Sequence, residues 1–148
     1  EKQLQEKAIS TGELLAFSRS IEARKQLFII DACQSGSAVE GFSTRGIEQQ
    51  RAVVQLARSA GIALITSSSN EQASSEAKEL EHGIFTYALL EGLKGKADGS
   101  SFDKKITVNE LKAYLDQRVP ELSQKFHSVS QYPTAYIKGQ DFPLILVK

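Results

Sequence analysis

The chain has 148 residues, of which 41% are hydrophobic and 24% charged, and its 18 basic and 18 acidic side chains cancel to a formal net charge of zero. This composition is typical of one globular domain, and the charge balance gives no reason to expect nucleic acid or an anionic membrane as a partner. No apolar run reaches the ~20 residues that cross a bilayer, and a single cysteine excludes an internal disulfide. These features fit a cytoplasmic protein.

The first predicted element is a helix near the N-terminus. Ser10 or Thr11 can cap it, because a hydroxyl oxygen accepts a hydrogen bond from the free backbone N–H groups of a first helical turn. Apolar side chains follow at helical spacing, at Leu14, Phe17 and Ile21.

Two short apolar runs, residues 27–30 and 62–66, predict strands buried on both faces of a parallel sheet. Residues 34–46 are rich in Gly and Ser and have no apolar periodicity, which predicts a loop. A helix is expected over residues 47–60, ended by Gly61. Strand, helix and strand together predict a βαβ unit with a right-handed crossover.

The second half of the chain predicts a helix over residues 83–93 and a polar loop over residues 95–105. Thr107 and Glu110 have the spacing of a capping box. They open a further helix, which is expected to stop near Pro120. Two more short strands are expected, at residues 134–137 and 143–147.

The segment Asp31-Ala32-Cys33-Gln34-Ser35-Gly36 follows the first predicted strand directly. Ligands and chemistry in open α/β sheets gather at the carboxyl ends of strands, so we expect Cys33 at a crevice. A thiol becomes a nucleophile there when a neighbouring base takes its proton. A lone cysteine is more often a small buried hydrophobe, so the surrounding motif has to decide between the two interpretations.

This segment resembles the caspase signature Gln-Ala-Cys-[Arg/Gln/Gly]-Gly, and more closely the Asp-x-Cys-x-Ser-Gly form of metacaspases and bacterial caspase-like peptidases. Residues 82–93 and 106–111 resemble later elements of the same family, in the same order. The resemblance implies a three-layer α/β caspase-like fold, with a mostly parallel sheet flanked by helices. Residues 1–148 would form the C-terminal portion of a single peptidase domain that works through a Cys/His dyad, in programmed cell death or bacterial defence.

The resemblance also gives roles to individual residues. Cys33 matches the nucleophile, and Gly36 is a small neighbour that lets the backbone approach the substrate at the oxyanion hole. Asp31 stands where caspases have a Gln in a pocket for aspartate; a carboxylate there attracts Lys or Arg, so cleavage after basic residues is expected. Orienting or capping the strand end is the alternative role for Asp31. Ser67 and Ser68 are expected to line the pocket, in a segment whose backbone pairs with the peptide substrate as an added strand.

The catalytic histidine of this family lies ≈ 50 residues before the cysteine, whereas only 32 residues precede Cys33. His82 and His127 both follow it; His82 matches a helix start of the family, and His127 lies in a polar stretch. We therefore expect the histidine, and the first part of the sheet, on an upstream segment or separate chain. The absence of an initiating Met agrees with this, and the chain is expected to fold only with that segment.

Metal binding has weak support in the sequence. Asp98, Ser100, Asp103 and Glu110 lack the spacing of a calcium loop, so no metal site is predicted; some metacaspases use calcium, which makes it a candidate cofactor by resemblance alone. The loop after the cysteine offers Arg45 as a processing site. Two other functions remain open: an inactive caspase-like scaffold that binds partners, and a small-ligand-binding α/β domain, for which no phosphate-loop motif is present.

Overall fold

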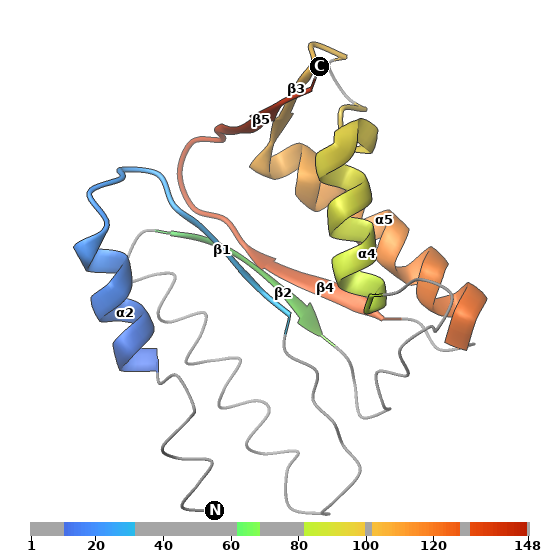
Figure 1. The fold of residues 1–148 in the computed structure, drawn as a ribbon, viewed down its shortest axis with the longest axis horizontal. Helices are drawn as coiled ribbons and strands as arrows, with labels where there is room; N and C mark the ends of the chain where they lie inside the picture. The colour runs from blue at the N-terminus through green and yellow to red at the C-terminus, as the bar shows by residue number, and fades with distance from the viewer. Residues whose placement is uncertain (1–10, 32–61, 69–81, 100–101, 128–130, 148) are drawn as a thin grey trace, which may run out of the picture.

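The computed structural model describes residues 11–31, 62–68, 82–99, 102–127 and 131–147. The elements in chain order are α2 (Thr11–Ser20), β1 (Leu27–Ile30), β2 (Ala63–Ser68), α4 (Ile84–Glu91), the π-helical turn η1 (Gly92–Lys96), β3 (Lys105–Thr107), α5 (Val108–His127), β4 (Tyr132–Tyr136) and β5 (Pro143–Leu146) (Figure 1). The predicted α/β class is confirmed. The loop expected at 34–46 and the helix at 47–60 lie outside the described residues.

The larger sheet has the strand order β1-β2-β4. β1 and β2 are parallel, with Leu27 opposite Ala63, as their apolar runs predict. β4 is antiparallel to β2, with Tyr132 opposite Ser68, so the described sheet is mixed, and a mostly parallel sheet stays a prediction for the complete fold. The reason is the path of the chain: α4 begins at the carboxyl end of the parallel pair and leads away, and α5 returns to that end (Figure 1). β4 therefore starts there and must run in the opposite direction.

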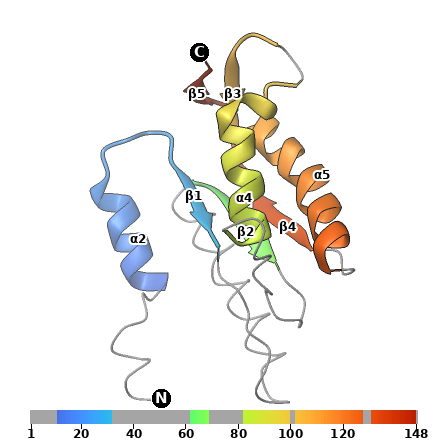
Figure 2. The ribbon, with the colours of Figure 1, turned by 45° about the vertical axis from the view of Figure 1, so that its right-hand side comes forward.

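The two faces of the sheet bury different side chains. Ile65 faces α4 and α5 and joins the larger hydrophobic cluster, which also contains Phe85 and Leu115. Leu64 lies on the opposite face, in a smaller cluster to which α2 contributes Leu14. Figure 2 shows α2 on one side of the sheet and α4 with α5 on the other. Such two-sided burial explains why β2 reads as a continuous apolar run rather than an alternating one. β1 is only partly buried within the described residues, and its Ile29 is exposed.

The N-terminal helix is confirmed, although its apolar stripe is only partly buried. α2 ends at Ser20, so Ile21 lies just beyond it. The side chain of Phe17 is 60% exposed within the described residues. The loop that follows is held by Gln26, whose Nε2 donates to the carbonyls of Ser18, Ile21 and Ala23.

The helix expected to stop near Pro120 continues to His127, so that prediction is wrong. A proline inside a helix removes one N–H bond and costs about 3 kcal/mol. Here the turns on both sides of Pro120 are buried, with Val119 before it and Leu122 after it in the larger cluster. Burial of apolar side chains on this face offsets the cost and carries the helix through the proline.

The region expected as a polar loop at residues 95–105 contains the end of η1 and the start of β3. β3 pairs with β5 in a second, two-stranded sheet, Ile106 opposite Ile145. Among the described helices, none combines the length and apolar character needed to cross a membrane.

Candidate active site

Three elements meet at the carboxyl end of β1, around the side chain of Asp31. Ser67, near the end of β2, donates from its Oγ to Asp31 Oδ1 at 2.7 Å. Thr86, in the first turn of α4, donates from its Oγ1 to Asp31 Oδ2 at 2.5 Å. Both carboxylate oxygens therefore have a hydroxyl donor, and Asp31 remains exposed. The parallel pairing of β1 with β2 explains the first contact, because both strands end at the same edge of the sheet.

α4 begins directly beside this carboxylate. A Cβ placed on Gly83, the residue before the helix, would lie 3.8 Å from Asp31 Oδ2. Among the described residues no side chain caps the helix start, and the first backbone N–H groups of a helix carry a partial positive charge. The site is thus an exposed carboxylate at the positive end of a helix.

The structure brings together two of the predicted site residues, Asp31 and Ser67. Ser68 ends β2, but the placement of its side chain lies outside what the structure describes, as do Cys33 and Gly36. The candidate processing residue Arg45 is likewise outside the described residues. Asp31 is the described residue nearest in sequence to Cys33, which comes two residues later.

The two histidines differ in what the structure shows. His82 is exposed, in the bend immediately before α4, one residue from the glycine that lies against Asp31. His127 is the last residue of α5, and its side chain is not among the described ones.

Thr86 is a site residue that sequence reasoning missed. It lies inside the segment 82–93 that resembles the family, where only the apolar face of the helix carries a pattern. A hydroxyl in the first turn of the helix is the signal that the sequence offers, and it does not tell whether that hydroxyl faces a carboxylate or water.

The expected pairing of a peptide substrate with the end of β2 is limited because β2 already pairs with β1 and β4. Thr66 is opposite Ile30 on one side and Thr134 on the other, so substrate pairing is excluded at this residue. Ser67 and Ser68 pair with β4, through Pro133 and Tyr132. Their remaining edge lies on the side of β1, beyond its last paired residue.

The acidic residues considered for calcium serve local backbone contacts. Asp98 accepts the N–H of Lys104 at 3.0 Å, and Asp103 accepts the N–H of Lys105 at 3.0 Å. Glu110 accepts the N–H of Thr107 at 2.9 Å, while its own N–H donates to the Thr107 hydroxyl at 3.2 Å, which confirms the capping box. Within the described ranges, which omit Ser100, no three His, Cys, Asp or Glu side chains gather as a metal site.

The far end of α4 is fixed by an ionic network around Glu91, whose side chain is only 12% exposed. Its Oε2 accepts from Arg118 Nε at 2.8 Å and from Tyr114 at 3.2 Å, and Lys96 pairs with its Oε1. Burial raises the pKa of Glu91, but the hydrogen bonds and charges of Arg118 and Lys96 outweigh burial and lower it to about 2. Burial and the nearby Glu91 charge raise the pKa of Tyr114 to about 12. The network ties α4 to α5.

We expect this network to make stability depend on acid. Because the pKa of folded Glu91 is lowered, its contribution is complete above the ordinary value of 4.5 and is lost as pH falls toward about 2. Glu91→Gln should lower the free energy of unfolding by about 1–3 kcal/mol at pH 7. The variant should also lose less stability than the wild type between pH 4.5 and 2, as measured by urea unfolding at each pH. Asp116→Asn, which removes an exposed pair with Lys112, serves as the control and should change little. If Glu91→Gln loses as much stability as the wild type between pH 4.5 and 2, Glu91 is not the source of the acid dependence.

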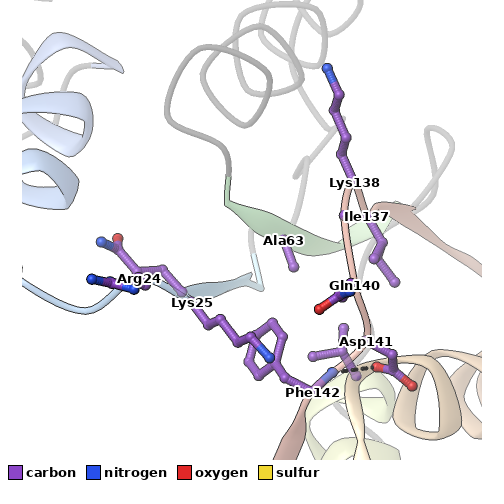
Figure 3. A pocket seen from close by; sticks show the side chains of 11 residues that line it. Arg24, Lys25, Ala63, Ile137, Lys138, Gln140, Asp141 and Phe142 are labelled. Carbon is purple, nitrogen blue, oxygen red and sulfur yellow. Dashed lines mark hydrogen bonds between the residues drawn. The ribbon is translucent and has the colours of Figure 1, made fainter.

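A cavity of about 270 Å³ lies at the opposite end of the sheet, where β2 begins. Its lining is basic and partly aromatic, with Arg24 and Lys138 at its margins and Lys25 reaching toward Phe142 (Figure 3). The Lys25 ammonium lies 5.6 Å from the centre of the Phe142 ring. Ligand sites of parallel strands lie at their carboxyl ends, so the Asp31 edge, and not this cavity, is the candidate active site.

The fold is that of an α/β protein, with a parallel strand pair. An exposed carboxylate, two residues before a cysteine, lies at the carboxyl ends of these strands, where α/β proteins bind ligands. The family model described as the caspase domain matches residues 13–141. The chain therefore belongs to the caspase-domain family of cysteine peptidases, as its motifs predict. Comparison with the curated proteins and with the solved structures gave no match.

Proposed function

We propose that the chain is the C-terminal part of a cysteine endopeptidase that cleaves after Arg or Lys. Cys33 attacks the scissile carbonyl, and a histidine takes the thiol proton and passes it to the leaving amine. The carbon–nitrogen bond breaks, an acyl-enzyme remains, and water releases the acid and the free thiol. The backbone N–H of Cys33, with the small Gly36 nearby, stabilises the oxyanion.

The observation that carries the specificity is the position of the Asp31 carboxylate. It is exposed at the edge where the substrate is expected, and within the described part of the chain each oxygen has one hydroxyl donor. A carboxylate oxygen has two lone pairs, so both oxygens can accept a further hydrogen bond from a basic side chain. The alternative role of Asp31, a tie between β1, β2 and α4, uses the same two contacts and does not need an exposed carboxylate.

The edge of β1 with which no described strand pairs supports an upstream segment as the source of the histidine. Among the described residues β1 pairs only with β2, and its Ile29 is 37% exposed. An unpaired apolar edge is a template for another strand. We infer that a segment preceding Glu1, on the same or a separate chain, adds its strands here and completes the three-layer caspase-like fold. The same segment brings the histidine imidazole to Cys33. We propose that the protein works in the cytoplasm.

A peptidase assay tests this proposal. The protein, together with its upstream segment, should release the fluorophore from a peptide that ends in Arg, and Cys33→Ala should reduce turnover to background. A matched peptide ending in Asp should stay uncut, because the Asp31 carboxylate repels it. If wild type and Cys33→Ala are equally inactive on the Arg peptide, the inactive scaffold is the better description.

A further inference from the structure

Thr86 contacts the carboxylate on which the proposed specificity depends. Its Oγ1 lies 2.5 Å from Asp31 Oδ2, and the Ser67 Oγ lies 2.7 Å from Oδ1. Hydrogen bonds to an ionised acceptor are shorter and stronger than those between neutral groups. One hydroxyl on each oxygen fixes the rotation of the carboxylate as well as its position.

The Thr86 hydroxyl is itself held by a well-anchored part of α4. The two preceding residues, Ile84 and Phe85, are buried in the larger hydrophobic cluster. The next residue, Tyr87, donates its N–H to the Gly83 carbonyl at 2.9 Å. A β-branched side chain on a helix has few rotamers. Thr86 therefore offers its proton from a nearly fixed point.

We infer that Thr86 is a positioning residue that sets the plane of the Asp31 carboxylate for a guanidinium group. This inference rests on the proposed cleavage after basic residues. A guanidinium donates two parallel N–H bonds in a rigid fork and needs both oxygens in its plane. An ammonium is a compact point charge and tolerates a rotated carboxylate. Loss of the Thr86 donor therefore affects Arg substrates more than Lys substrates.

The test uses Thr86→Val, which keeps the shape and removes the donor, and Thr86→Ser, which restores it. Three peptides identical except for a terminal Arg, Lys or Ala are compared in the full protein. Thr86→Val should raise KM for the Arg peptide about tenfold, the effect of one charge-assisted hydrogen bond, with a smaller rise for Lys and none for Ala. Values of kcat should change little, and Thr86→Ser should behave as wild type.

Binding of benzamidine, whose amidinium presents the same planar fork, gives a readout without turnover. It is measured by NMR titration on Cys33→Ala with and without Thr86→Val. Benzamidine binding that is about tenfold weaker in the double variant than in Cys33→Ala supports the inference. If the wild type cleaves no peptide, the proposed peptidase reaction fails, but this binding result still supports the role of Thr86. Equal losses for all three peptides, or unchanged benzamidine binding, would show that Thr86 only ties α4 to the sheet.

Discussion

Asp31→Asn is expected to lower kcat/KM for peptides that end in Arg by about 30-fold or more, because loss of one partner of a desolvated charge pair costs about 2–5 kcal/mol. The substitution is nearly isosteric. It removes the negative charge and places an amide nitrogen opposite one of the two hydroxyl donors. A hydroxyl can turn and accept from that nitrogen. The fold should therefore survive a change that the substrate does not tolerate.

The measurement compares Arg and Ala peptides in the active protein. For Asp31→Asn the Ala peptide should keep its rate, because Cys33 and the oxyanion donors are untouched. Asp103→Asn is the matched control, since Asp103 is exposed and accepts a backbone N–H, and it should leave both rates unchanged. An Asp31→Asn protein that cleaves the Arg peptide at the wild-type rate would leave Asp31 only its role as a tie at the strand end.

Much of the fold follows from local patterns in the sequence. The runs at 27–30 and 62–66 predict two parallel strands, and helices on both faces of the sheet explain why the run at 62–66 needs no alternation. Two features depend on long-range packing that local patterns do not contain. α5 passes through Pro120 because Leu122 is buried, and β4 is antiparallel because two helices return the chain to the same end of the sheet.

The residues of the candidate site likewise differ in whether local sequence patterns predict them. Asp31 and Ser67 could be predicted because each directly follows an apolar run, the two runs pair side by side, and the family resemblance gives both residues a role. Thr86 could not, because its contact spans 55 residues and depends on where α4 begins relative to the sheet. No periodicity distinguishes a hydroxyl that faces a carboxylate from one that faces water.

Phe85 connects the hydrophobic core to this site. Its side chain is 1% exposed and belongs to the cluster that Ile65 of β2 and Leu115 of α5 share. The next residue along α4 is Thr86, whose hydroxyl lies 2.5 Å from Asp31. Packing of Phe85 therefore fixes the start of α4 against the sheet, and with it the donor to the carboxylate.

Phe85→Ala is expected to lower the free energy of unfolding by about 3–5 kcal/mol, because it removes a buried ring and leaves a cavity that the surrounding helices fill only in part. Phe85→Leu keeps most of the volume and should cost clearly less. Urea unfolding of the protein with its upstream segment measures both. Under conditions in which Phe85→Ala remains folded, a rise of KM for Arg peptides beyond that for Ala peptides is expected, since a loosened α4 no longer holds Thr86 against Asp31. A loss below about 0.5 kcal/mol, the range of surface substitutions, would show that this side of α4 is not packed against the sheet.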